Sequence, residues 1–152
     1  MSRAVGRLLT LPVLLLLAFA AMAEDEVFVT DSAAIRGYDA VAYFIEGKPV
    51  PGDAEIRHEW NGATWLFASR ENRDRFATEP ARYAPQFGGF CAFGLSRGYK
   101  VGTDPAAFTI HDDKLYLNYS LPVRATWLQD TDAYIRKGER NWKSLEHEPH
   151  EP

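Results

Sequence analysis

The sequence has very little cysteine: Cys91 stands alone among 152 residues. Without a second cysteine the chain has no internal disulfide and no C-x-x-C redox pair. A lone cysteine in an exported domain is a buried small apolar side chain, an incidental thiol, a metal ligand, a redox-active thiol or the site of an intermolecular disulfide. The cysteine count alone leaves these roles open.

Catalytic motifs with a local signature are also missing. The sequence contains no G-x-S-x-G elbow, no H-E-x-x-H helix and no phosphate-cradling loop, and the spacing of Gly88 and Gly89 does not fit a dinucleotide fingerprint. A Cys–His nucleophile pair needs its base beside the thiol. Sequence separation does not say whether His58 or His111 approaches Cys91, so the residues favour binding over catalysis.

Long apolar runs are missing except at the amino end, where residues 8–20 are almost wholly apolar. Arg3 and Arg7 precede this run, and Ala-Met-Ala at 21–23 follows it as a small-x-small cleavage site. This pattern predicts a signal peptide over residues 1–23 and export to the periplasm or the cell exterior. A spanning helix needs about 20 apolar residues, so we expect no membrane span in the mature chain.

Basic residues are too few and too scattered to form a nucleic-acid-binding face. Removal of Arg3 and Arg7 with the signal peptide leaves 15 basic residues against 21 acidic ones, a net charge of about −6. Nucleic-acid binding requires clustered Lys and Arg, and we therefore expect no nucleic-acid partner. The 129 residues that remain after cleavage are enough for one domain with a core.

Turn residues predict a mixture of short strands and helices. Asn61-Gly62 supplies the positive φ angles of a tight hairpin turn, and Asp112-Asp113 marks a second turn. The strands predicted around these two turns are residues 56–60 with 64–68, and 108–111 with 115–119. In the first of these strands, Ile56, His58 and Trp60 share one face.

Capping and breaker residues define the remaining segments. Ser69 caps a helix that continues through Ala77 and ends at Pro80. A second short turn is expected at 81–83. The paired glycines Gly88 and Gly89 allow tight folding just ahead of Cys91. Other segments are predicted from composition and periodicity: an irregular lead-in at 24–36, an exposed loop at 46–54, amphipathic helices over 121–145 with a break near Asp130, and a charged tail at 146–152.

Five segments in a fixed order carry a family resemblance: GYDAVAYF at 37–44, WNGATWLF at 60–67, ENRDRF at 71–76, ATEPARYAPQFGGFCAFG at 77–94 and KLYLNYS at 114–120. Together they resemble the YHS domain family in its small exported form. The resemblance covers residues 37–145. It implies one compact α+β domain, with antiparallel hairpins, short helices and a C-terminal amphipathic helical segment. It also implies a metal-binding role alongside copper-handling proteins.

The sequence departs from the metal-associated members of that family, which place cysteines beside the aromatic strand and at the start of the following helix. This chain has Ala68-Ser69 at that place, so its metal site would have to combine Cys91 with histidine. His58 is the first partner considered and His111 the next. Thiolate and imidazole suit Cu(I) or Zn(II). A closed zinc site needs four protein ligands, which disfavours zinc.

The sequence thus predicts an exported, non-catalytic domain that binds a transition metal, copper before zinc, in trafficking, sensing or protection. A backbone group or a metal-transfer partner protein would complete the open site. The alternative is a module that binds a small molecule or a protein, with Cys91 structural or redox-active. The aromatic residues around the central motifs either line an apolar pocket or fill the core. A cavity beside Cys91 would favour the ligand site.

Overall fold

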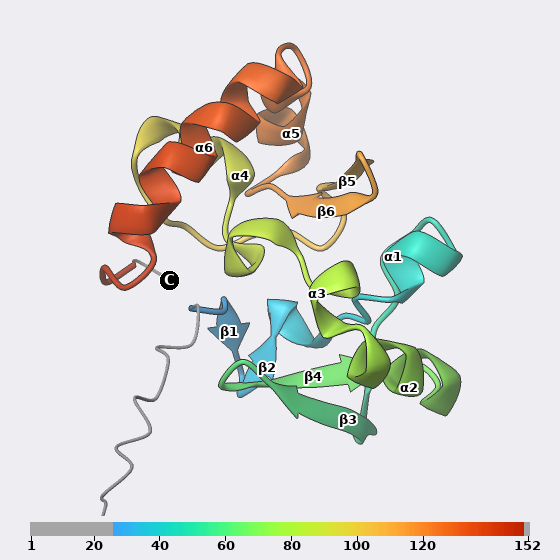
Figure 1. Ribbon diagram of the computed structural model, residues 1–152. Coiled ribbons are helices and arrows are strands. Elements are labelled where there is room, and N and C mark those ends of the chain that lie inside the picture. Colours follow the sequence, from blue (N-terminus) through green and yellow to red (C-terminus); the bar gives the residue numbers. More distant parts are fainter. Residues whose placement is uncertain (1–25, 151–152) are drawn as a thin grey trace, which may run out of the picture.

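The computed structural model describes residues 26–150, in which short helices alternate with three two-stranded antiparallel sheets (Figure 1). The strands are β1 (Val29–Thr30), β2 (Ala33–Ala34), β3 (Asp53–Trp60), β4 (Ala63–Phe67), β5 (Phe108–His111) and β6 (Lys114–Leu117). The α-helices are α1 (Ala42–Ile45), α2 (Arg70–Thr78), α3 (Pro80–Tyr83), α4 (Ala92–Arg97), α5 (Leu121–Trp127) and α6 (Thr131–Leu145). Two 3-10 turns are η1 (Ile35–Gly37) and η2 (Gln86–Gly89). This confirms the predicted α+β class, while the predicted signal peptide lies outside the described residues.

The β3–β4 hairpin forms around the predicted Asn-Gly turn. Asn61 and Gly62 have φ angles of 51° and 71°, which suit the right-handed twist of the two strands. β3 begins at Asp53, earlier than predicted, and its pairing with β4 is irregular before Arg57. Along β3, half-buried side chains alternate with exposed ones, which places His58 on the half-buried face.

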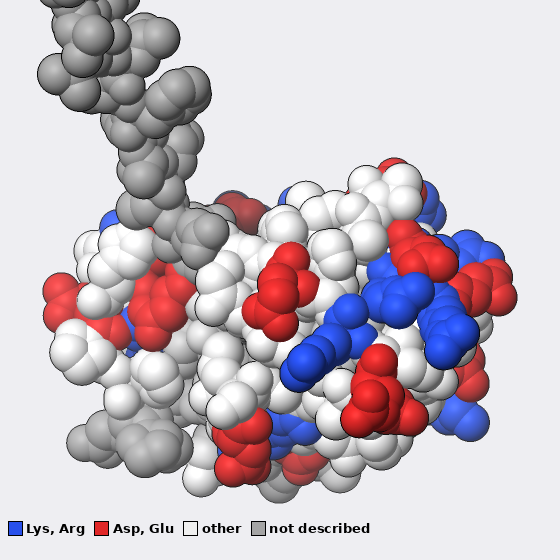
Figure 2. Space-filling view, turned by 90° about the horizontal axis from the view of Figure 1, so that it is seen from below, with Lys and Arg blue, Asp and Glu red and all other residues white. Residues whose placement is uncertain are grey.

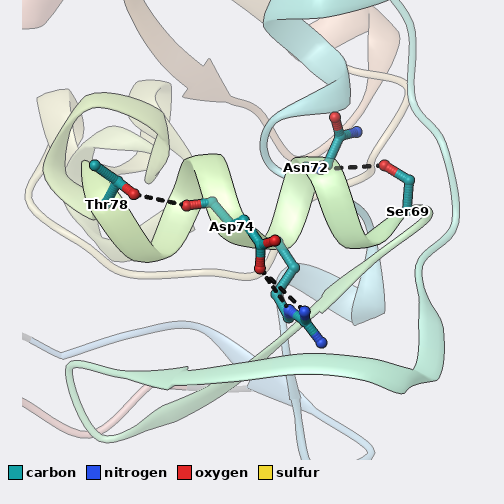
Figure 3. Close-up of polar contacts among 5 residues, drawn as sticks. Ser69, Asn72, Asp74 and Thr78 are labelled. Atoms are coloured by element: carbon teal, nitrogen blue, oxygen red, sulfur yellow. Dashed lines mark hydrogen bonds and ion pairs between the residues drawn. The ribbon is translucent and has the colours of Figure 1, made fainter.

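Figure 3 shows the predicted cap of α2. The Ser69 Oγ accepts a hydrogen bond from the Asn72 backbone N–H at 3.1 Å, so one otherwise unpaired donor of the first turn is satisfied. On the exposed side, Arg73 pairs with the Asp74 carboxylate at 3.0 Å. Pro80 ends α2 and occupies the first turn of α3. The turn expected at 81–83 is therefore helical, because a proline at the start of a helix loses no hydrogen bond.

The prediction that residues 24–36 form an irregular lead-in is wrong for their described part. This part contains β1, β2 and η1, and Phe28 and Ile35 are buried. The Phe28 N–H donates to the Gly88 carbonyl oxygen at 2.9 Å. A Cβ at Gly88 would lie 1.9 Å from the Glu26 carbonyl oxygen. The lead-in is therefore ordered by a distant glycine segment rather than by its own sequence.

The β5–β6 hairpin turns at Asp112 and Asp113, whose φ angles are 48° and 58°. β6 ends at Leu117, two residues earlier than predicted. Beyond that point, the Asn118 N–H donates to the Ala107 carbonyl oxygen and the chain turns toward α5. The Arg124 Nε then donates to the Thr109 Oγ1 at 2.9 Å, which ties α5 to this hairpin.

The two carboxyl-terminal helices are separated as predicted. Asp130 has non-helical backbone angles between α5 and α6. Gly138 of α6 faces the Phe87 ring, and a Cβ there would lie 2.9 Å from the Phe87 Cζ. α6 packs against α4 and η2 through this close approach. It contributes the carboxyl-terminal layer of the domain (Figure 1).

The buried apolar side chains form two clusters. The first joins β2, η1, α1, β4, α2, α3 and β6, with β3 packed against it, and its largest members are Trp65, Phe67, Phe76 and Tyr43. The second joins η2, α4, β6, α5 and α6 and includes Phe28, Phe87, Phe90, Leu95 and Trp127. Aromatic side chains bury large areas, and they are the largest members of both clusters. The aromatic residues singled out from the sequence are mainly core.

Part of the predicted charged tail packs on the domain. The His150 ring lies 4.8 Å from the Phe90 ring, and its Nδ1 lies 3.2 Å from the Glu26 carboxylate. The buried Lys100 ammonium pairs with Glu26 and donates to the Glu146 carbonyl oxygen. These contacts bring residues near both ends of the described chain to one place.

Charges of both signs share the face that Figure 2 presents. Basic side chains gather toward one side of that face, and acidic side chains lie directly beside them.

Within the described residues, every helix is too short or too polar to traverse a bilayer.

Candidate metal centre

The three predicted metal ligands lie on different elements. Cys91 directly precedes α4, His58 lies in β3 and His111 ends β5. In Figure 1 the β3–β4 hairpin and the β5–β6 hairpin occupy opposite halves of the molecule. Among residues 26–150, the one group of three metal-ligating side chains contains His111 but neither Cys91 nor His58.

Cys91 is held as a capping residue of α4. Its side chain is 1% exposed, and its Sγ accepts hydrogen bonds from the N–H groups of Gly94 at 3.4 Å and Tyr119 at 3.2 Å. Burial raises the pKa of the Cys91 thiol, and hydrogen bonds from the backbone N–H groups of Gly94, Tyr119 and Phe93 oppose that shift. The thiol is therefore neutral at physiological pH, whereas a metal ligand or nucleophile requires the thiolate.

Asn118 completes the surroundings of the thiol. Its Oδ1 accepts hydrogen bonds from the Phe93 N–H at 3.0 Å and from the Cys91 thiol at 3.5 Å. Within the described residues its buried Nδ2 has no hydrogen-bond partner. An amide N–H group is a donor and does not ligate a cation. The polar atoms around Cys91 thus suit a structural cysteine better than a metal ion.

His58 contacts an aromatic side chain of the first cluster. Its ring lies 6.2 Å from the Phe76 ring at 70°, an edge-on arrangement. This arrangement is typical of a half-buried histidine that packs against α2. The position agrees with the predicted face of β3.

His111 belongs to a group of three side chains, which we call the His111 cluster: His111, Asp112 and Asp132. The His111 Nε2 lies 2.8 Å from the Asp132 Oδ1 and 3.5 Å from the Asp112 Oδ2. One ligand atom from each residue lies within 4.8 Å of the other two. The His111 side chain is 31% exposed, and the aspartates are more exposed, at 86% and 69%. All three side chains are therefore in contact with solvent.

Two features of the fold assemble the His111 cluster. The tight β5–β6 turn places Asp112 beside His111, and the break at Asp130 starts α6 so that Asp132 falls in its first turn. Neither Asp112 nor Asp132 was predicted as a metal ligand from the sequence. Adjacency to His111 was a weak signal for Asp112. Nothing local pointed to Asp132, which is 21 residues from the histidine that it contacts.

Comparison with known protein families yielded one match, in the centre of the chain. Residues 41–87 match the family model of the YHS domain. The YHS match runs from the start of α1 into η2 and includes His58. No curated protein and no solved structure matched the chain.

The YHS match ends before Cys91 and well before His111. It covers the β3–β4 hairpin, α2 and α3, which supply most of the first apolar cluster, while β2 and β6 outside the match supply Ala34, Leu115 and Leu117. The structure continues beyond it without a break, because η2 and β6 pack together and β2 packs on β4. The His111 cluster is thus a feature of the segment that follows the YHS match.

Asp39, just before the YHS match, is a buried carboxylate that was not predicted from the sequence. Asp39 is 0% exposed and accepts four hydrogen bonds, from the N–H groups of Val41, Ala42 and Ala68 and from the Asn72 Nδ2, at 2.8 to 3.1 Å. All four hydrogen bonds come from groups of this chain. Asp39 therefore has a structural role: it starts α1 and links α1 to β4 and α2.

Proposed function

We propose that the protein is an exported, non-catalytic metal-binding domain that takes a divalent transition metal at the His111 cluster. The observation that carries the proposal is the convergence of one imidazole and two carboxylates within 4.8 Å. Imidazole suits Zn, Cu, Fe and Ni, and Asp and Glu carboxylates are also ligands in protein zinc sites. The resemblance to YHS domains and the YHS match at residues 41–87 support a metal-binding role.

We propose copper as the bound metal, with zinc as the second candidate. At the His111 cluster the copper would be Cu(II) rather than Cu(I). Cu(I) prefers the soft sulfur of cysteine or methionine, while Cu(II) takes nitrogen and oxygen ligands. Among divalent ions, Cu(II) has the highest affinity for a given site of this kind. Cu(I) binding through Cys91 and His58 stays a prediction, and the burial of the thiol counts against it.

Three protein ligands leave at least one coordination position for water or for a group on another molecule. The exposure of Asp112 and Asp132 gives a partner protein direct access to the ion. An open site of this kind suits metal transfer, sensing or protection. Export is proposed from Arg3, Arg7 and the apolar run at residues 8–20. Amino-terminal sequencing of the protein recovered from the cell exterior or periplasm tests it, with Glu24 as the expected first residue.

The metal site is tested by titration of the mature protein with Cu(II) and Zn(II) against a competing chelator. We expect one-to-one binding that weakens at least about tenfold, or ~1.4 kcal/mol, in His111→Ala and in Asp132→Asn. Matched controls are His58→Ala, Cys91→Ser and a His147→Ala/His150→Ala double variant, because the tail could also hold Cu(II). Unchanged binding in both cluster variants, with loss in a control, assigns the metal elsewhere and refutes the proposed site.

A further inference from the structure

A cavity of about 400 Å³ lies where the two apolar clusters meet. It is bordered by the turn of the β3–β4 hairpin, by α3, by η2 and by α6. Its walls include four aromatic rings and two charged side chains: Trp60, Trp65, Phe87, Trp142, Glu139 and Lys143. The volume falls within the range of small-molecule sites. We call this space the aromatic cavity.

The aromatic walls come in two pairs from the two halves of the domain. The Trp60 and Trp65 rings lie 5.9 Å apart at 57°, and the Phe87 and Trp142 rings lie 6.2 Å apart at 61°. The Trp65 Nε1 donates to the Trp60 carbonyl oxygen at 3.0 Å, so its polar edge is already satisfied. Trp65 and Phe87 are only 1% and 8% exposed, so the accessible π surface of the cavity comes mainly from the half-buried Trp60 and Trp142.

The position of the Phe87 ring is fixed by unusual backbone and by a glycine. Phe87 and Gly88 both have left-handed backbone, with φ angles of 56° and 62°. A phenylalanine pays a conformational cost for such angles. The ring rests against Gly138 of α6, where a Cβ would lie 2.9 Å from its Cζ. This wall of the cavity is thus preformed, and the paired glycines singled out in the sequence help to build it.

The charges at the rim lie one helical turn apart on α6. Glu139 and Lys143 are both exposed, and neither forms an ion pair with another residue of the described segment 26–150. Positions i and i+4 of a helix lie about 5–6 Å apart at Cβ. Lys143 disfavours a purely cationic ligand and Glu139 disfavours a purely anionic one, so the rim matches a ligand that carries both charges.

We propose that the aromatic cavity binds a small zwitterion whose cationic end is a methylated ammonium group. Methylated ammonium carries few or no hydrogen-bond donors and is held by aromatic faces through cation–π attraction. The methyl groups would lie against the half-buried Trp60 and Trp142 rings beside Glu139, and the carboxylate of the ligand would face Lys143. Ten residues of α6, about 15 Å, separate Asp132 from Trp142. This second site is independent of the His111 cluster.

The test uses glycine betaine as the probe, with tryptophan fluorescence and calorimetry as readouts. We expect one-to-one binding at least about tenfold tighter than that of choline, which lacks the carboxylate. The same margin is expected over the tert-butylacetate anion, in which carbon replaces the ammonium nitrogen. Glu139→Gln and Lys143→Met should each weaken betaine binding at least about threefold, and Trp142→Ala should abolish it. Lys137→Met, a neighbour on the same helix that does not line the cavity, should have no effect.

Three results would overturn the inference. The first is the absence of betaine binding with a Kd below about 10 mM in the folded wild-type protein. The second is equal affinity for betaine and the tert-butylacetate anion, which would mean that the cavity selects shape and not charge. The third is unchanged affinity in both Glu139→Gln and Lys143→Met, whose exposed side chains are not needed for folding. His111→Ala should leave betaine binding intact, which separates this site from the metal site.

Discussion

Asp39→Ala should destabilise the domain more than any exposed acidic substitution. The change leaves four donors without their acceptor, and three of these donors are buried: the Val41 and Ala42 N–H groups and the Asn72 amide. Each buried donor without a partner costs about 1–3 kcal/mol. Allowing for water at the more exposed Ala68, the expected loss in the free energy of unfolding is about 4 kcal/mol. This is a large part of the 5–15 kcal/mol of a typical domain.

Urea unfolding followed by circular dichroism measures this loss. With a slope of about 2 kcal/mol per molar urea, the midpoint should fall by about 2 M. Asp53→Ala is the matched control, because its carboxylate is exposed and accepts one hydrogen bond, from the Glu55 N–H at 2.9 Å. It should change the free energy of unfolding by less than about 0.5 kcal/mol. If the Asp39 and Asp53 variants unfold at the same urea concentration, the structural role assigned to Asp39 is wrong.

Three further predictions concern single contacts. Burial raises the pKa of the Cys91 thiol, so the stability contributed by the neutral thiol is complete below its unfolded pKa and lost as pH rises through the folded one. Burial also raises the pKa of Tyr43 and Tyr116, which titrate in both proteins, so alkaline urea titrations should show a larger loss in the wild type than in Cys91→Ser, and matching profiles would argue against it. Gly138→Ala gains about 1 kcal/mol of helix propensity but crowds Phe87. We expect a net loss of about 1 kcal/mol by thermal melting, whereas a higher melting temperature would show that the ring moves freely. Ser69→Ala removes the cap on the Asn72 N–H and should cost about 1 kcal/mol, while Ser144→Ala, at an exposed hydroxyl, should be neutral.

The elements that the sequence predicted correctly are those set by neighbouring residues. Asn61-Gly62 and Asp112-Asp113 take the positive φ angles of tight turns, and Ser69 caps α2. The break near Asp130 separates α5 from α6 as expected. Each of these signals acts over a few residues, so no knowledge of the tertiary fold was needed.

Structural features that depend on contacts between distant segments were not predicted from the sequence. β1 and β2 form because Phe28 packs beside Gly88 and hydrogen-bonds to it, which the composition of residues 24–36 did not indicate. His111 meets Asp132 only because α5 returns the chain to the β5–β6 turn. The burial of Asp39 likewise depends on donors from β4 and α2.

The contact between Glu26 and His150 has a consequence for how the chain can be reordered. Their side chains lie 3.2 Å apart, so a short linker can join residue 150 to residue 26. New chain termini at Gly47 would interrupt no helix or strand. This glycine is exposed and has no neighbour within 4 Å of its Cβ position. A circular permutant built in this way should keep both apolar clusters. It would also move the chain ends to the loop before β3, where a fused reporter or partner leaves the contact between residues 26 and 150 undisturbed.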